Sequence, residues 1–135
     1  MVDPSVATAG GWVVGTPPSF ADEHLLDRLE ETPLERIDEL DFGPIAMDRG
    51  GEVLGYNTFE SRRAGIARER VIGCNFFVDI GPCTNNDMVA ERFHTGEDLD
   101  EEMDYFTLRM APTPVTLRLL AHRGSARQYL AVRFR

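Results

Sequence analysis

Apolar residues along the chain form short runs that are typical of β-strands, separated by polar turns. The runs 42–47 and 52–56 flank the polar, glycine-containing turn 48–51, a signature of a tight hairpin. Three further strand-like segments close the chain, at 103–110, 115–122 and 128–134. Alternation of apolar and polar residues is clearest in the last two of them. This pattern predicts an α+β domain with a central, mostly antiparallel five-stranded sheet and short helices packed over one face.

Helical spacing of apolar residues precedes this sheet. Segment 19–31 is predicted to be a helix with Ser19 or Asp22 as its N-cap. Its apolar positions are Phe20, Leu25, Leu26 and Leu29. Segment 34–40 is a second short amphipathic piece. We divide the chain into residues 1–37, a tail with short helices, and a domain over residues 38–135.

Three more helices are expected between the hairpin and the last three strands, at 57–63, 68–72 and 88–93. Asn57 is the expected N-cap of the first, Gly73 ends the second, and the polar residues 84–87 are N-cap types ahead of the third. The third is a short helix by its own pattern, although it stands where the long helix of the domain is expected. An acidic turn is expected at 94–102.

Length and composition are those of one globular domain. The chain has 135 residues, enough to bury a sizeable core, and 42% of them are hydrophobic. No apolar run approaches the roughly 20 residues that a membrane span requires. The N-terminus lacks the basic region and the apolar core of a signal peptide, so we expect a cytoplasmic protein without a membrane partner.

The charge of the chain is strongly acidic, with 23 Asp and Glu against 14 basic residues, all of which are arginine. Nucleic acid is therefore an unsuitable partner, because phosphate binding needs clustered positive charge. Two cysteines are too few for a disulfide scaffold or a zinc site. The three histidines, His24, His94 and His122, are scattered without ligand spacing, so we expect no metal site.

Cys83 is the first candidate for chemistry. It directly follows Pro82, which restricts the backbone, so the thiol is presented from a stiff loop. If residues 84–87 start a helix, its N-terminus favours a thiolate or an acyl-thioester oxygen, which suits a covalent attachment point. The alternative, that Cys83 is a small buried apolar residue, is the commoner situation for a free cysteine.

Tyr56 and Glu60 are the second candidate pair. They are four residues apart at a junction of strand and helix, so both can point into one pocket if Asn57 begins the helix. Burial would raise the pKa of the Glu60 carboxyl, which would then donate a hydrogen bond rather than accept one. The alternative is an exposed tyrosine beside a solvated helical glutamate.

Taken together, these segments resemble the photoactive yellow protein family. The resemblance covers roughly residues 38–135 and rests on motifs that occur in the family's order and near its spacing. They are Phe42-Gly43-x-Ile45, Leu54-x-Tyr56-Asn57-x-x-Glu60, Val71-Ile72-Gly73-x-Asn75-Phe76-Phe77, Pro82-Cys83-Thr84 and Met110-x-Pro112-Thr113. A general member of the wider PAS superfamily would share the sheet but seldom the Tyr, Glu and Pro-Cys-Thr set.

The resemblance implies a PAS-fold blue-light photoreceptor that carries p-coumaric acid (4-hydroxycinnamic acid) as a thioester on Cys83. By the same resemblance, Tyr56 and protonated Glu60 hydrogen-bond the phenolate oxygen, and the backbone N–H of Cys83 holds the thioester carbonyl. The remaining matched positions are Thr84 of the Pro-Cys-Thr motif, the ring-enclosing Phe76, Ile80 and Phe106, and Met110, which assists return to the dark state.

The resemblance also implies a signalling mode. By this resemblance, residues 1–37 act as a lid, and chromophore isomerisation with proton transfer from Glu60 leads to partial unfolding in which this N-terminal segment loosens. We expect a monomeric, non-enzymatic sensor that acts through a separate, unidentified downstream signalling protein.

Four positions depart from the family pattern. Cys74 replaces a charged residue beside the Asn-Phe-Phe run. Ala64 replaces a threonine that hydrogen-bonds the tyrosine, Ile66 replaces an arginine that covers the pocket, and Leu108 replaces an aromatic hydroxyl. Two other functions stay open: a PAS interaction module without chromophore, and a sensor that uses Cys83 as a redox thiol or binds another ligand. Neither of these alternatives needs Tyr56, Glu60 and Cys83 together.

Overall fold

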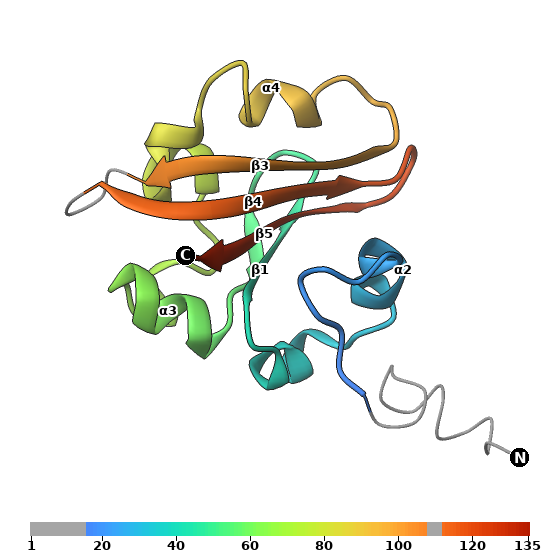
Figure 1. The fold of residues 1–135 in the computed structure, drawn as a ribbon. Coiled ribbons are helices and arrows are strands. Elements are labelled where there is room, and N and C mark those ends of the chain that lie inside the picture. Colours follow the sequence, from blue (N-terminus) through green and yellow to red (C-terminus); the bar gives the residue numbers. More distant parts are fainter. Residues whose placement is uncertain (1–15, 108–111) are drawn as a thin grey trace, which may run out of the picture.

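A five-stranded antiparallel sheet is the centre of the fold, with strand order β2-β1-β5-β4-β3 (Figure 1). The structure is a computed structural model, and it describes residues 16–107 and 112–135. Its strands are β1 (Gly43–Asp48), β2 (Val53–Gly55), β3 (Leu99–Thr107), β4 (Thr113–Ala121) and β5 (Arg127–Phe134). The predicted α+β class and the predicted hairpin between the first two strands are confirmed.

Strand β3 is longer than the sequence pattern indicates. It begins at Leu99, which is buried, and pairs with β4 from Leu99 opposite Ala121 to Thr107 opposite Thr113. The predicted acidic turn at 94–102 is therefore wrong in its second half. Acidic residues at every second position of β3 face away from the larger core described below, so their density reflects an exposed strand side rather than a turn.

The helical elements are short. They are α2 (Leu25–Glu30), η2 (Leu34–Glu39), α3 (Thr58–Ala64), η3 (Arg68–Arg70), η4 (Phe76–Ile80), η5 (Pro82–Thr84) and α4 (Ala90–Phe93). The predictions for 34–40, 57–63 and 68–72 are confirmed in position. No helix in the described ranges has the length and apolar character needed to cross a membrane.

Two helix predictions are wrong in extent. Helix α2 starts at Leu25 and not near Ser19, and no side chain caps it, because Asp22 instead accepts a hydrogen bond from the backbone of His24 and pairs with Arg28. The helix expected over 88–93 is confined to the four residues of α4, so no long helix stands at this place. Asn86 Oδ1 accepts bonds from the backbone N–H groups of Met88 and Val89, so a side-chain turn stands where the first helical turn was expected.

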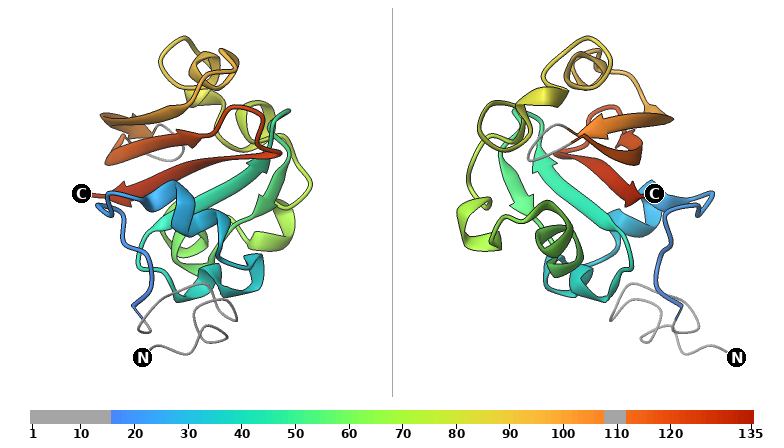
Figure 2. Two further views of the ribbon diagram at one scale, coloured as in Figure 1. Left: turned by 90° about the vertical axis from the view of Figure 1, so that its right-hand side faces the viewer. Right: turned by 60° about the vertical axis from the view of Figure 1, so that its left-hand side comes forward.

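Helical segments cover both faces of the sheet, which corrects the expectation of one covered face. Strand residues that alternate in direction enter two separate cores. Ile45, Leu117 and Leu130 join the larger core, together with side chains from η4 and α4. Ala46 and Tyr129 join the smaller core with side chains of α2 and η2. Figure 2 shows α2 and α3 on opposite faces.

Arg118 holds the N-terminal segment against the sheet. Its side chain is 9% exposed and makes a two-point contact with Asp100, at 2.8 and 2.9 Å between nitrogen and oxygen. Its remaining terminal nitrogen donates to the carbonyl oxygens of Phe20, at 2.8 Å, and Asp22, at 2.7 Å. The Arg133 guanidinium lies 4.6 Å from the centre of the Phe20 ring. The chain from Phe20 onward is thus bonded to the face opposite α3.

Replacing Arg118 with Met is expected to lower the free energy of unfolding by about 1–3 kcal/mol, because the buried Phe20 carbonyl and the partly buried Asp22 carbonyl lose their donor. It should also make the segment before α2 cleave earlier in limited proteolysis. The control is Arg123→Ala, which removes an exposed ion pair with Glu97 and should change stability by less than about 1 kcal/mol. Equal protease sensitivity of the Arg118 variant and the unaltered chain would refute this role.

Candidate functional site

A cavity of about 410 Å³ lies between the larger-core face of the sheet and the segments α3, η4 and η5. Its apolar wall comes mainly from strand and η4 residues: Ile45, Phe76, Ile80, Leu117, Leu130 and Val132. Its polar lining residues include Tyr56, Glu60, Cys83 and Thr84. The structure therefore brings together six of the eight residues expected from the sequence, in one largely apolar chamber.

Asn57 sets the direction of Glu60. The Asn57 side chain is fully buried, and its Oδ1 accepts the backbone N–H of Glu60 at 2.9 Å as the N-cap of α3. Its Nδ2 donates to the carbonyl oxygens of Ile37 and Phe42, at 2.9 and 2.8 Å. The first turn of α3 is thereby fastened to η2 and to the start of β1. This attachment turns Glu60 inward rather than toward solvent.

The Glu60 carboxyl lies against the backbone of β1 and is 6% exposed. A Cβ atom on Gly43 would lie 2.1 Å from Glu60 Oε1, so the close approach requires glycine at that position. No described residue forms a hydrogen bond with Oε1. Burial raises the pKa of Glu60 to about 8. The carboxyl is therefore protonated at neutral pH, as the sequence analysis expects for a buried residue at this position.

Tyr56 reaches the same cavity from the end of β2. Its side chain is 1% exposed, and the residue precedes the Asn57 cap, so the change from strand to helix places it beside the first turn of α3. The expectation that Tyr56 and Glu60 share one pocket is confirmed. The alternative of an exposed tyrosine and a solvated glutamate is wrong.

Cys83 lies in the short turn η5 at the cavity, with a free and partly exposed thiol. The expected helix N-terminus next to Cys83 is wrong, because α4 starts only at Ala90. A different contact holds the loop. The Cys83 carbonyl oxygen accepts hydrogen bonds from Tyr105 Oη at 2.6 Å and from Asn86 Nδ2 at 3.0 Å, and Asn86 Nδ2 also donates to Tyr105 Oη at 2.7 Å.

Sequence reasoning missed this contact between the Cys83 loop and β3. Asn86 was recognised only as an N-cap type, and Tyr105 only as a strand residue. The one available signal is that alternation in β3 puts Tyr105 on the same side as the buried Leu99, which is the side of the larger core. The hydrogen bonds that the Cys83 carbonyl oxygen accepts from Tyr105 and Asn86 orient the loop, in place of the helix dipole that was expected to do so.

Neighbouring residues complete the loop side of the cavity. The Thr84 hydroxyl donates to the carbonyl oxygen of Gly81 at 2.6 Å, which closes the η5 turn. A Cβ atom on Gly81 would lie 2.8 Å from the Phe76 ring, so glycine allows the ring to pack directly on the backbone. Phe76 and Ile80 line the cavity as expected.

Phe106 does not enter the cavity, which corrects the expectation for this residue. Its side chain is 56% exposed, while its neighbour Thr107 lines the cavity. The reason is the two-residue period of β3, in which adjacent side chains face opposite sides of the sheet. Met110 and Leu108 lie outside the described residues.

Two departures from the expected pattern, Ala64 and Ile66, both line the cavity. Arg63 also lines it, although the sequence analysis did not single it out. Its guanidinium carbon lies 5.5 Å from the centre of the Phe59 ring and 5.7 Å from that of Phe134. An arginine thus reaches this cavity from a position three residues before Ile66.

Comparison with known proteins gives consistent results. The chain is 35% identical over 104 residues to photoactive yellow protein from Rhodothalassium salexigens, covering 74% of this chain and 83% of the relative. It is 33% identical over 104 residues to photoactive yellow protein from Halochromatium salexigens, with the same coverage. No family model matches the chain.

Solved structures agree with these sequence relatives. The photoactive yellow protein domain of the sensor histidine kinase Ppr from Rhodospirillum centenum matches with a TM-score of 0.69 and 35% identity, over 77% of this chain and 95% of that domain. The PAS domain of an HTR-like protein from Haloarcula marismortui matches with a TM-score of 0.57 and 15% identity, over 70% and 86% of the two chains. The fold is therefore a PAS fold, as expected.

The raised pKa of Glu60 makes stability depend on pH. The folded state keeps this proton up to about pH 8, whereas the unfolded chain releases it near 4.5, so the free energy of unfolding decreases as pH rises between these values. The decrease is at most about 5 kcal/mol, at about 1.4 kcal/mol per pH unit. Denaturant unfolding of the unmodified chain at pH 5 to 8 should show this decrease in the free energy of unfolding. In Glu60→Gln the contribution of the Glu60 proton to the pH dependence should be absent. If the free energy of unfolding changed with pH in the same way in both proteins, Glu60 would not be a buried, protonated carboxyl.

Proposed function

This chain belongs to the photoactive yellow protein family, and on that premise we propose that it is a blue-light photoreceptor with p-coumaric acid bound to Cys83 as a thioester. The observation that carries the proposal is the single cavity shared by a free thiol, Cys83, a buried tyrosine, Tyr56, and a buried carboxyl, Glu60. A redox thiol or a binding module without a chromophore needs no such carboxyl.

The residues present fit a phenolic chromophore. The cavity volume of about 410 Å³ is within the range of small-ligand sites, roughly 300–1,000 Å³, and its wall is mainly apolar, as a flat aromatic acid requires. Glu60 Oε1 forms no hydrogen bond with a described residue, and a phenolate oxygen would accept one from it. The partly exposed Cys83 thiol can reach an activated acyl group.

Each residue then has a distinct task. Cys83 would hold the acyl group covalently, while Asn86 and Tyr105 fix the backbone of its loop. Tyr56 and protonated Glu60 would donate short hydrogen bonds to the phenolate, which stabilise a charge that would otherwise be costly in an apolar chamber. The bound group supplies absorption of blue light and a double bond that light can isomerise.

The response to light would start at Glu60. After isomerisation this carboxyl would release its proton to the phenolate and remain as an unpaired buried carboxylate. Such a charge costs several kcal/mol, a large part of the stability of a domain. The carboxylate would lie against Gly43 at the start of β1, next to Phe42, which packs on Phe20 of the N-terminal segment. This contact provides a route to loosening of that segment and to a separate signalling protein.

The first test is the absorption spectrum of the purified chain before and after reaction with activated p-coumaric acid. We expect a strong band in the blue region that moves to the near ultraviolet on acidification and is missing in Cys83→Ala. Cys74→Ala is the matched control, because Cys74 is also free but does not line the cavity. A protein that stays colourless, with Cys83 accessible and reversibly oxidised by mild peroxide, would instead favour the thiol sensor.

The second test concerns the light response of the coloured protein. Glu60→Gln keeps the shape of the side chain but cannot release this proton, so the slow light-induced change in far-ultraviolet circular dichroism should become severalfold smaller. Colour should persist, because Gln can still donate a hydrogen bond. An unaltered structural change in the variant would reject proton transfer from Glu60.

A further inference from the structure

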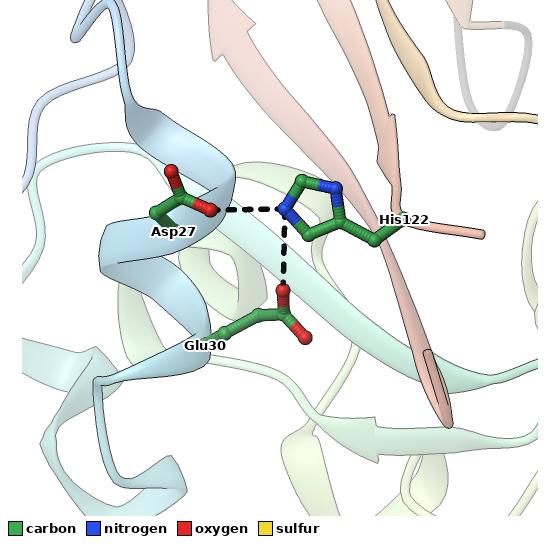
Figure 3. Close-up of side chains that lie close together, drawn as sticks. All are labelled: Asp27, Glu30 and His122. Atoms are coloured by element: carbon green, nitrogen blue, oxygen red, sulfur yellow. Dashed lines mark hydrogen bonds and ion pairs between the residues drawn. The ribbon is translucent and has the colours of Figure 1, made fainter. Parts of the chain in front are cut away.

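Asp27, Glu30 and His122 bring three metal-binding groups together outside the cavity (Figure 3). Asp27 and Glu30 lie three residues apart on α2, and His122 directly follows β4. His122 Nε2 is 2.9 Å from Asp27 Oδ1 and 3.6 Å from Glu30 Oε1. All three ligand atoms lie within 4.8 Å of one another. We call these residues the His122 cluster.

The His122 cluster has two carboxylates at one imidazole nitrogen, whereas an ion pair needs only one. Nε2 carries at most one hydrogen, yet two carboxylates face it from positions three residues apart on one helix. The second oxygen of Glu30 accepts a hydrogen bond from Ser125 Oγ at 2.9 Å. Such a bond from outside the cluster orients a carboxylate in the way that second-layer partners orient metal ligands.

The surroundings add negative charge. The hollow beside the cluster is also lined by Glu23, His24 and Asp98, and by Asp100, which is paired with Arg118. Arg28, the arginine of α2, pairs with Asp22, and Arg123, which follows His122, pairs with Glu97. The side chain of His122 is 43% exposed and that of Asp27 is 63% exposed, so a cation can enter from solvent.

We propose that the His122 cluster binds a divalent transition-metal cation of the zinc type. One imidazole nitrogen with two carboxylates is a donor set that suits Zn²⁺, whereas Mg²⁺ and Ca²⁺ prefer oxygen ligands alone. Ligand atoms around tetrahedral zinc lie roughly 3.4 Å apart, given bonds of about 2.0–2.2 Å. Side-chain rotations that move the ligand atoms by about an ångström would therefore bring them to these separations, with water as the fourth ligand.

A bound cation would connect α2 to the turn between β4 and β5. Ser125 and His122 belong to that turn region, and α2 forms part of the smaller core with Leu120 and Tyr129. The metal would thus hold the N-terminal segment on the sheet at a second point beside Arg118. This consequence does not depend on whether a chromophore is bound.

Isothermal titration of the full chain with Zn²⁺, in excess Mg²⁺ to saturate diffuse acidic sites, tests the proposal. We expect one Zn²⁺ per chain, with affinity lowered at least about tenfold in His122→Ala and in Asp27→Asn. His94→Ala is the matched control, since His94 is also exposed and lies 3.8 Å from Glu91, and its affinity should be unchanged. Zinc should also slow amide hydrogen exchange across α2 in the unaltered chain but not in His122→Ala.

Three results would overturn the site. Binding that Mg²⁺ abolishes would indicate a diffuse acidic surface, and equal loss in His94→Ala and His122→Ala would indicate nonspecific histidine binding. Loss of binding in Cys83→Ala would assign the metal to the thiol. Circular dichroism of each variant checks that it is folded, so that lost binding reflects lost ligands.

Discussion

The burial of one protonated carboxyl is the constraint on which the rest of this structure depends. Glu60 is inward-facing because Asn57 caps α3 and at the same time bonds to η2 and β1. Gly43 provides the space for its carboxyl, and the low-polarity surroundings keep its proton in place up to about pH 8. A charge at this position would be opposed by the same packing that now stabilises the neutral form. Ionisation of Glu60 would therefore lower the stability of the fold through this one residue.

In the proposed mechanism the sheet would transmit this coupling, because both its faces are covered. Alternate residues of β1, β4 and β5 belong to different cores, so a strand displaced on the cavity side would also shift on the side of α2. On that second side a few polar contacts, chiefly those of Arg118 and the His122 cluster, supplement a small apolar core. Release of this segment would also expose Leu25 and Leu29, which are at most 1% exposed, so the light-driven signal proposed for Glu60 would have to offset the burial of these side chains as well as the polar contacts.

Much of the site could be predicted from the sequence, because its residues belong to local patterns. The Asn57 cap, the hairpin before it and the joint placement of Tyr56 and Glu60 follow from spacing within a few residues, and all three are confirmed. The errors arise where distant segments decide the outcome. Pairing with β4 extends β3 into the acidic run and directs Phe106 outward, and the Asn86 side chain displaces the first turn of the expected helix.

The sequence by itself determined the fold class, the family and the chemical groups at the cavity, since these depend on residue types in a fixed local order. Only the tertiary structure decided which side chains meet across the fold. It bonded Tyr105 to the Cys83 loop, put Arg63 at the cavity and brought His122 to α2, although His122 and Asp27 are far apart in sequence. Such contacts depend on helix packing and on strand register, and a one-residue shift in register exchanges the two faces of a strand.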